Sequence, residues 1–214
     1  MPFKTPNKTS EYIRGLMKEE TDEIYKDLCA YADAHFIPVL LPETANVLKQ
    51  IIMLSNPQKI LEIGTAIGYS SLIMLRNSDA QLYTVEMLED RVEKAREFFD
   101  KAGVLSRATF FVGDAGEIVP QLTGEYDFIF MDGPKTRYIE YLPYLKRLLK
   151  SGGILLCDNV LFNGMVSGEE EIIQKKNSIV VKIEEFLQNL YQDEDYVTSI
   201  IPVGDGLSLS IKNK

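Results

Sequence analysis

Histidine and cysteine are scarce in this 214-residue chain. His35 is the only histidine, and the two cysteines, Cys29 and Cys157, lie far apart in the sequence. Neither cysteine has a second Cys or a His at metal-ligand spacing, which disfavours both a disulfide framework and a zinc site. We therefore expect two buried thiols, and we predict that His35 packs on a helix face without a catalytic role.

Long apolar runs are missing as well. No stretch approaches the ~18 consecutive apolar residues that a membrane helix needs. Residues 1–10, which carry Lys4 and Lys8, lack the apolar core of a signal peptide. We therefore expect a cytoplasmic protein with no membrane partner. The length and the 45% hydrophobic content predict one globular domain over residues 1–214.

An excess of positive charge is also lacking. The chain has 23 Lys and Arg against 32 Asp and Glu, a net charge of -9, and a pI near 4.8. Such a balance opposes nonspecific attraction to nucleic acid, so a nucleic-acid substrate needs a local basic patch. Solvated surface charge is the alternative for each candidate in that patch. The candidates are Lys4, Lys8, Arg14, Lys18, Lys146, Arg147, Lys150, Lys175 and Lys176.

The chain is patterned in two parts. Residues 1–57 are predicted to form N-terminal helices, because apolar residues recur at helical spacing in residues 21–36 and Pro42 suits the first turn of a further helix. The stripe in residues 21–36 consists of Ile24, Leu28, Tyr31, Ala32 and His35. Residues 58–214 alternate short apolar runs with amphipathic helices such as 89–102, which predicts an α/β core.

The apolar runs of the second part predict a sheet. Five runs between helices indicate parallel strands with helices on both faces. They occupy residues 59–64, 81–86, 108–113, 127–132 and 153–159. Two further runs, 196–203 and 206–212, flank Gly204-Asp205 and predict an antiparallel C-terminal hairpin.

A glycine turn follows the first predicted strand. Gly64 and Gly68 let the backbone turn sharply and approach a ligand closely, and the start of the next helix favours an anionic group such as a carboxylate. No Gly-Lys-Ser/Thr follows, which excludes a phosphate-binding P-loop, and the spacing differs from that of dinucleotide-binding turns. A tight strand-to-helix turn without a ligand explains the two glycines equally well.

Acidic residues end the next two strands. Glu86 lies about 20 residues after the glycine turn, where a carboxylate accepts hydrogen bonds from ribose hydroxyls, so we predict an adenosine-containing ligand. Asp114-Ala115 ends the third strand, from which it could reach the adenine. The alternative for Asp114 is a cap for the following helix.

Oxygen-bearing side chains end the fourth and fifth strands. Asp132 follows one strand and Asp158-Asn159 the other, and each has an alternative role in turn formation. In an open parallel sheet these side chains converge at the carboxyl rim, and two carboxylates with an amide suit a hard ion such as magnesium. Lys135 lies three residues after Asp132; a bound divalent cation would lower its pKa toward the range of a general base.

Four segments together carry a family resemblance. They are ILEIGTAIGYS, the Asp132-to-Lys135 segment, LLCDNVLFNG and IIPVGDGLSLS, which occur in this order. The sequence from about residue 35 onward resembles the metal-dependent O-methyltransferases that include the catechol and caffeoyl-CoA enzymes. Within this family, the AIGYS turn, the DNVLFNGMV segment and the IIPVGDGL ending resemble the bacterial tRNA 5-hydroxyuridine methyltransferases, which form 5-methoxyuridine at the wobble position.

The resemblance implies a fold and a set of site residues. The fold is a Rossmann-like, seven-stranded methyltransferase sheet whose last strand inserts antiparallel beside the strand before it. Asp132, Asp158 and Asn159 are implied as metal ligands and Lys135 as the base, with Asp132 also part of the catalytic site. Family members are commonly dimers, so we expect a homodimer. The residues implied in S-adenosylmethionine binding are Leu40, Glu62, Gly64, Thr65, Ser70, Glu86, Asp114, Ala115 and Asp132.

Three alternatives remain open. A catechol-like small acceptor is favoured by the acidic composition, and also because Gly168-Glu169-Glu170-Glu171 precedes only Lys175-Lys176, where the tRNA enzymes carry a strongly basic run. A nicotinamide-dependent dehydrogenase is disfavoured by the spacing of the two glycines. A non-catalytic adenosine-binding module would have no reason to keep a metal constellation beside Lys135.

Overall fold

The computed structural model describes residues 8–213 as eight α-helices and seven strands. The helices are α1 (Lys8–Leu16), α2 (Glu23–Ala34), α3 (Pro42–Ser55), α4 (Tyr69–Arg76), α5 (Glu89–Lys101), α6 (Ala115–Ile118), α7 (Tyr138–Leu148) and α8 (Asn177–Gln192). The strands are β1 (Lys59–Ile63), β2 (Gln81–Glu86), β3 (Ala108–Val112), β4 (Tyr126–Met131), β5 (Leu149–Cys157), β6 (Tyr196–Ile201) and β7 (Leu207–Lys212). None of these helices is long and apolar enough to cross a membrane.

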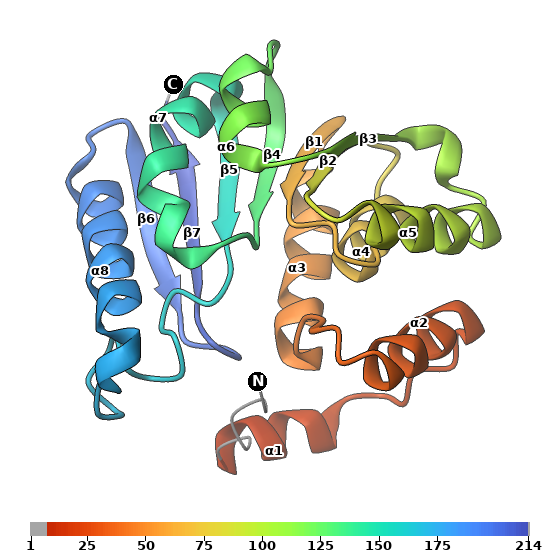
Figure 1. The fold of residues 1–214 in the computed structure, drawn as a ribbon, viewed down its shortest axis with the longest axis horizontal. Coiled ribbons are helices and arrows are strands. Elements are labelled where there is room, and N and C mark those ends of the chain that lie inside the picture. Colours follow the sequence, from red (N-terminus) through yellow and green to blue (C-terminus); the bar gives the residue numbers. More distant parts are fainter. Residues whose placement is uncertain (1–7, 214) are drawn as a thin grey trace.

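All seven strands belong to one sheet with the order β3-β2-β1-β4-β5-β7-β6 (Figure 1). Strands β1 to β5 are parallel, and β7 inserts antiparallel between β5 and β6. The reversal of strand order between β1 and β4 opens a crevice at the carboxyl ends of these strands, where ligands bind in sheets of this type. The prediction of a Rossmann-like, seven-stranded methyltransferase sheet with a C-terminal antiparallel hairpin is confirmed.

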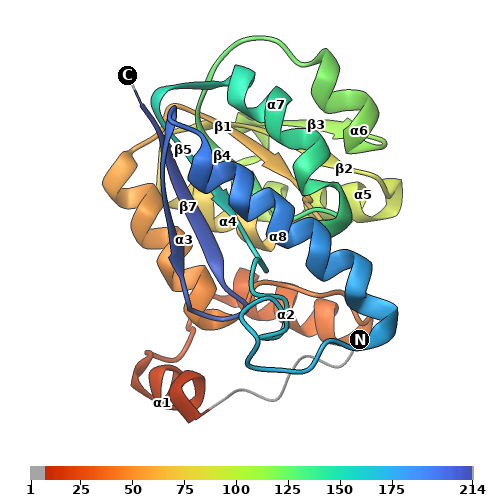
Figure 2. The ribbon, with the colours of Figure 1, turned by 90° about the vertical axis from the view of Figure 1, so that its left-hand side faces the viewer.

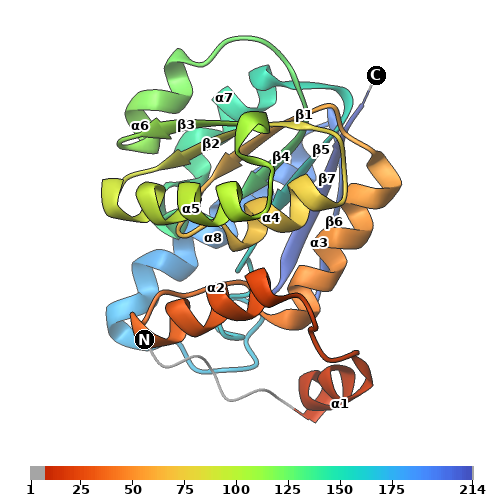
Figure 3. The same ribbon diagram turned by 90° about the vertical axis from the view of Figure 1, so that its right-hand side faces the viewer.

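Helices cover both faces of the sheet because alternate strand residues point to opposite sides. In β1, Ile60 packs into a core with residues of α2, α3, α4 and α5. The next residue, Leu61, packs into a second core with residues of α7 and α8. Figures 2 and 3 show the two helical layers from opposite sides. Both cores are continuous with the strands, so the strand ends are rigidly placed.

Helices α1 and α2 lie beyond the carboxyl ends of the parallel strands, whereas α3 packs on one face of the sheet (Figure 1). Helix α3 begins at Pro42, as predicted, and the side chain of Asp22 caps α2 by accepting a hydrogen bond from the amide of Ile24 at 2.9 Å. The apolar stripe predicted for residues 21–36 is wrong for its last member, His35. His35 follows the helix and is exposed, stacked on Tyr31 with 3.9 Å between ring centroids.

The thiols differ in exposure. Cys157 is buried, as predicted, whereas Cys29 is only half-buried, so the prediction of two buried thiols is wrong for Cys29. The two residues are both free thiols, in agreement with the expectation that no disulfide framework exists. Cys29 lies on α2, whose buried side is formed by Leu28 and Ala32. Because Cys29 lies next to this buried stripe and not within it, its side chain is only partly covered.

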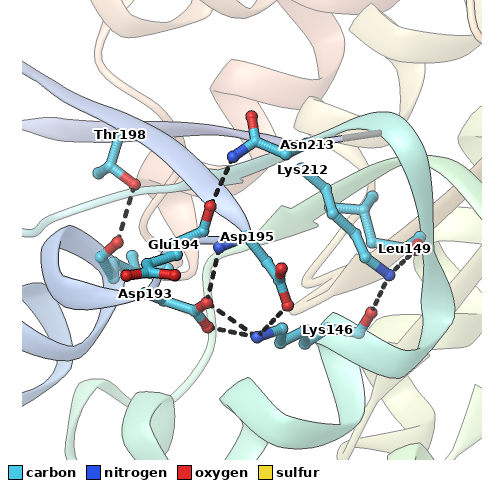
Figure 4. A network of polar contacts seen from close by, with 9 residues as sticks. Lys146, Leu149, Asp193, Glu194, Asp195, Thr198, Lys212 and Asn213 are labelled. Carbon is cyan, nitrogen blue, oxygen red and sulfur yellow. Dashed lines mark hydrogen bonds and ion pairs between the residues drawn. The ribbon is translucent and has the colours of Figure 1, made fainter.

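A polar network fixes the C-terminal hairpin at the end of the sheet opposite to the glycine turn (Figure 4). The Lys146 ammonium contacts the carboxylates of Asp193 and Asp195, each at 2.7 Å. Lys212 of β7 donates to the carbonyls of Lys146 and Leu149, both at 2.8 Å. The lysine pairs thus join the end of α7 to β7 and to the turn before β6.

The same network corrects the predicted basic patch. Lys146 is paired with Asp193, and Lys150 is paired with Asp127 at 2.7 Å, near the starts of β4 and β5. Helix α7 carries Lys146 and Arg147 away from the carboxyl ends of the strands. These basic residues therefore do not belong to a rim around the crevice. Lys4 lies outside the described residues.

Candidate functional site

The ends of four parallel strands border one cavity of about 1040 Å³. Gly64 follows β1, Glu86 ends β2, Asp132 follows β4, and Asp158-Asn159 follows β5. All of these residues line the cavity, together with Leu40 and Lys135. The structure thus brings together most of the residues that the sequence nominated. Thr65 and Ser70 line a small adjoining pocket that also contains Leu40 and Asp132.

The turn after β1 requires its glycines for steric reasons. Gly64 and Gly68 both have positive φ angles, 100° and 90°. A Cβ on Gly64 would overlap the carbonyl of Asp132, and one on Gly68 would overlap the ring of Phe99. The alternative of a tight turn therefore explains both glycines, and it also brings the backbone of the turn to the cavity wall, where Gly64 and Ala66 lie.

Glu62 lies beneath the turn and is fully buried. Its carboxylate accepts hydrogen bonds from Ser70 Oγ at 2.5 Å and Thr84 Oγ1 at 2.6 Å, and from Ser71 Oγ. Burial raises the pKa of Glu62 to about 7, against the opposing effect of these three hydroxyl donors. Glu62 lines neither the cavity nor the adjoining pocket, so its contact with the site runs through Ser70, which lines the adjoining pocket.

Glu86 faces the cavity and is held by backbone amides. One carboxylate oxygen accepts from the amide of Ala66 at 2.8 Å, and the other accepts from the amides of Met87 and Leu88 at 2.9 and 3.0 Å. The residue is only 8% exposed. The oxygen that accepts from Ala66 keeps a second lone pair, so the carboxylate has capacity for a hydroxyl donor from the cavity. Its contact with a ribose stays a prediction.

Asp114 caps α6, which is the alternative that the sequence left open. Its side chain accepts from the amide of Gly116, and Arg137 contacts both of its oxygens at 2.6 and 2.9 Å. The amide of Gly116 and the guanidinium of Arg137 hold the pKa of Asp114 below its usual value. Neither Asp114 nor Ala115 lines the cavity, and their contact with an adenine stays a prediction.

Arg137 is a residue that the sequence reasoning missed. It ends the short 3₁₀ helix η3 (Lys135–Arg137), and its Nε also donates to Glu140 at 2.9 Å. Arg137 therefore ties the end of β3, through Asp114, to the segment that carries Lys135. The Asp132-to-Lys135 segment does not indicate that Arg137 pairs with Asp114, since Asp114 lies 23 residues away in the sequence.

Asp132 and Asp158 form the acidic centre of the cavity. Asp158 is only 4% exposed, and its Oδ1 accepts from the amide of Asn159 at 2.7 Å. Burial, together with the nearby charge of Asp132, raises the pKa of Asp158 to about 8. Asn159 has a φ angle of 60°, in the left-handed region that Asn tolerates better than most residues. The centre thus places two carboxylates close together, and burial disfavours the ionised form of Asp158.

This donor set fits a hard divalent cation. Within residues 8–213, no group of three or more His, Cys, Asp and Glu side chains is placed to hold a metal, so a site here depends on the amide oxygen of Asn159 as third ligand. Two carboxylates and an amide oxygen are ligands that magnesium and calcium prefer. A cation would also neutralise Asp158, whose ionised form burial disfavours. The residues therefore fit the predicted metal.

Lys135 contacts Asp132 directly. Its Nζ lies 2.8 Å from Asp132 Oδ1. Burial lowers the pKa of Lys135, but the charges of Asp132 and Asp158 act in the opposite direction and the net pKa lies above its ordinary value. The predicted fall of this pKa concerned a site with a divalent cation bound, and it stays a prediction. In its protonated form Lys135 serves as the positive partner of Asp132.

Two aromatic side chains line the cavity, and sequence reasoning missed them too. Phe36 lines the cavity yet is 94% exposed, at a φ angle of 54°. Phe162 also lines the cavity, and Lys176 Nζ lies 5.3 Å from the centre of its ring. An exposed phenylalanine held in the left-handed region is an uncommon feature, and it offers a flat apolar surface at the entrance.

Further acidic residues line the cavity. Asp33, Glu43, Glu169 and Asp205 belong to its wall. Glu43 is neutralised by Arg14 of α1, with 2.7 Å between Arg14 Nε and Glu43 Oε2. This pair attaches α1 to the start of α3 beside the cavity.

Comparison with known proteins identifies relatives over the whole described region. A family model described as O-methyltransferase matches residues 8–213. A catechol O-methyltransferase from Niastella koreensis is 32% identical over 165 residues, covering 74% of this chain and 75% of the relative. A caffeoyl-CoA O-methyltransferase from Populus kitakamiensis is 29% identical over 202 residues, covering 90% of this chain and 83% of the relative.

Solved structures give the same result. The O-methyltransferase TomG from Streptomyces achromogenes, involved in tomaymycin synthesis and solved with S-adenosylmethionine, superposes with a TM-score of 0.83 at 26% identity, covering 97% of each chain. A methyltransferase from Podospora anserina with S-adenosylhomocysteine bound has a TM-score of 0.81 at 26% identity, covering 96% of this chain and 94% of that one. Both relatives were solved with the methyl donor or its demethylated product.

Proposed function

Because this chain belongs to the O-methyltransferase family and is an S-adenosylmethionine-dependent enzyme of the catechol and caffeoyl-CoA type, we propose that it uses a divalent cation to methylate 5-hydroxyuridine at the wobble position of tRNA. The cation would be held by Asp132, Asp158 and Asn159, and it would be magnesium. The observation that carries the proposal is that these three residues and Lys135 line the same cavity as Gly64 and Glu86.

The donor would lie against the glycine turn. S-adenosylmethionine supplies a methyl group that its sulfonium already activates. Leu40, Gly64 and Glu86 line the cavity, with Thr65 and Ser70 in the adjoining pocket, so these residues are placed to hold the donor. Glu62 would act by holding Ser70. Asp114 and Ala115 would contribute from the end of β3, where Arg137 fixes the Asp114 carboxylate.

The acceptor hydroxyl would be activated at the rim of β4 and β5. A divalent cation, when bound, supplies positive charge that lowers the pKa of a nearby hydroxyl. Asp132 and Asp158 would orient the acceptor in the cavity. Nζ of Lys135, once deprotonated, takes the proton of the acceptor hydroxyl. The main remaining task of the protein is alignment, because the donor carries the driving force and the two reacting atoms must meet in line.

The mouth of the cavity supports a nucleic-acid acceptor. Bases of single-stranded loops are recognised by stacking on aromatic side chains and by basic contacts to phosphates. Phe36 lines the cavity and is almost fully exposed, and Phe162 also lines the cavity, with Lys176 Nζ over its ring. A wobble base is already in a loop, so it would enter with little distortion. The AIGYS turn and the IIPVGDGL ending support the same acceptor.

A small catechol-like acceptor is the second candidate. The carboxylates of Asp33, Glu169 and Asp205 in the cavity wall oppose a polyanion, and a relative of this chain is a catechol O-methyltransferase. Both acceptors present a hydroxyl beside a second oxygen, which suits a hard cation. The acidic wall does not discriminate against an uncharged catechol.

Nucleoside mass spectrometry separates the two candidates. tRNA from cells with and without the gene should differ in 5-methoxyuridine, with 5-hydroxyuridine accumulating when the protein is absent. The kcat/KM of the purified enzyme should also be higher for tRNA with 5-hydroxyuridine than for simple catechols. Unchanged 5-methoxyuridine together with efficient catechol methylation would establish the second candidate.

We also propose that the chain forms one methyltransferase domain and works as a homodimer. Helix α1 buries none of its residues, and it exposes Tyr12 and Leu16, while Leu54 at the end of α3 is 86% exposed. Apolar side chains exposed on neighbouring helices are suited to pairing with a second copy. Sedimentation analysis should give twice the chain mass, and a monomer at all concentrations would refute this assembly.

A further inference from the structure

Tyr138 is buried directly behind the acidic centre. It is the first residue of α7, three positions after Lys135, and it has no solvent-exposed surface. Its ring packs edge-on against Phe186 of α8, with 5.4 Å between the centroids. The ring therefore fixes the position of the hydroxyl from the helical side of the sheet.

The hydroxyl of Tyr138 reaches the ends of both strands that carry the acidic centre. Its single proton is shared between the carbonyl of Met131, at 3.3 Å from the oxygen, and the carbonyl of Asp158, at 3.1 Å. The amide of Asp158 also donates to the Met131 carbonyl, at 3.0 Å. One phenol thus bridges β4 and β5 at the point where each strand ends.

Both carbonyls belong to peptide groups next to the proposed ligands. The Met131 carbonyl belongs to the peptide that leads into Asp132, and the Asp158 carbonyl belongs to the peptide that leads into Asn159. Asn159 has its unusual φ of 60° immediately after this second peptide. A donor that fixes the plane of a peptide restricts the direction of the side chain that follows it.

We propose that Tyr138 is a positioning residue for the divalent cation, because its hydroxyl locks the two peptides that aim Asp132 and Asn159 at the cavity. This inference rests on the cation of the proposed function. Removing a residue that holds metal ligands in place typically lowers the metal affinity or the activity 10–100-fold. Removing the Tyr138 hydroxyl is expected to change the affinity for the cation. It is not expected to change the affinity for the methyl donor, which would lie against the glycine turn after β1.

The chain offers a matched control. Tyr141 lies one turn further along α7, is 1% exposed, and its hydroxyl has no hydrogen-bond partner among the described residues. Tyr138→Phe and Tyr141→Phe therefore remove the same atom from the same helix at similar burial. They differ in whether that atom contacts the strand ends.

The test is calorimetric titration of the wild type and both variants with Mn²⁺, with S-adenosylmethionine titrated separately without metal. We expect the Mn²⁺ dissociation constant to rise about tenfold or more in Tyr138→Phe and to stay within about twofold of the wild-type value in Tyr141→Phe. Donor affinity should be the same in all three proteins. The electron paramagnetic resonance spectrum of bound Mn²⁺ should change in Tyr138→Phe alone.

Equal Mn²⁺ affinity and identical spectra in Tyr138→Phe and the wild type would overturn the inference while leaving the proposed function intact. A wild type that binds no Mn²⁺ would overturn the cation of the proposed function, and the inference with it. If Tyr138→Phe does not fold, the wild type decides: Mg²⁺ should shift the ¹³Cζ resonance of Tyr138, and an unchanged resonance at saturating Mg²⁺ refutes the positioning role.

Discussion

Glu62 makes the stability of the donor-free protein depend on pH. Its carboxylate is fully buried beneath the glycine turn, with hydroxyl donors from Ser70, Ser71 and Thr84. Burial raises its pKa from 4.5 to about 7, so the folded protein binds a proton there that the unfolded chain has released. We predict that replacing the carboxylate by an amide in Glu62→Gln removes this dependence.

The sign and size follow from proton linkage. Stability falls as pH rises wherever the folded state binds more protons than the unfolded state, which for Glu62 is the range from 4.5 to about 7. Each pKa unit corresponds to ~1.4 kcal/mol, so the wild type should lose about 3 kcal/mol across this range through Glu62. Glu62→Gln, which carries no titrating group at this position, should not lose it.

Urea denaturation between pH 5 and pH 8 measures the effect. The free energy of unfolding of the wild type, minus that of Glu62→Gln, should fall by about 3 kcal/mol from pH 5 to pH 8. Other titrating groups are common to both proteins and largely cancel. Glu43→Gln is the control. Burial raises the pKa of Glu43, but the hydrogen bond from Arg14 contributes to a net pKa below the ordinary value of 4.5, so the contribution of Glu43 to stability changes only below pH 4.5. Parallel profiles for the wild type and Glu62→Gln would refute the reasoning.

Four further substitutions test the site itself. Glu86→Ala should weaken S-adenosylmethionine binding by about 1–3 kcal/mol, because ribose hydroxyls lose their acceptor, and calorimetry showing unchanged affinity would remove Glu86 from the donor pocket. Asp132→Ala and Asp158→Ala should abolish turnover, and donor affinity should stay close to wild type in Asp158→Ala; full turnover in either variant would exclude that residue as a ligand. Phe36→Ala should weaken tRNA binding by about 1–3 kcal/mol in gel-shift titrations without affecting donor affinity, and unchanged tRNA binding contradicts a stacking role.

The sheet was predictable because its pattern is local. Parallel strands covered on both faces appear as short apolar runs, and each predicted run contains a strand. The start of β5 was not predicted, since Lys150, Ser151 and Gly152 interrupt the apolar pattern that begins at residue 153. Helix α8 was also not predicted individually, although Val180, Ile183 and Leu187 recur on its buried side.

The parts of the site that lie at strand ends were predictable from the sequence. The parts that depend on which side chains contact one another were not. Asp132 and Asp158 converge because parallel strands end at one rim, which the order of strands implies. The Arg137–Asp114 ion pair joins residues 23 positions apart, and Tyr138 resembles any buried aromatic residue of a helix. Of the candidates for the basic patch, Lys146 pairs with Asp193 at the end of α7 that lies away from the cavity, and sequence alone does not show which end of α7 faces the cavity.

Methyl transfer from labelled S-adenosylmethionine to tRNA tests the central proposal most directly. Purified protein is incubated with tRNA that contains or lacks 5-hydroxyuridine, each with magnesium or with excess chelator. We predict label only in the tRNA that contains 5-hydroxyuridine, only in the presence of magnesium, and as 5-methoxyuridine after digestion. Label at full rate in excess chelator would contradict the cation site, and methylation of catechol without any labelling of the hydroxylated tRNA would contradict the acceptor.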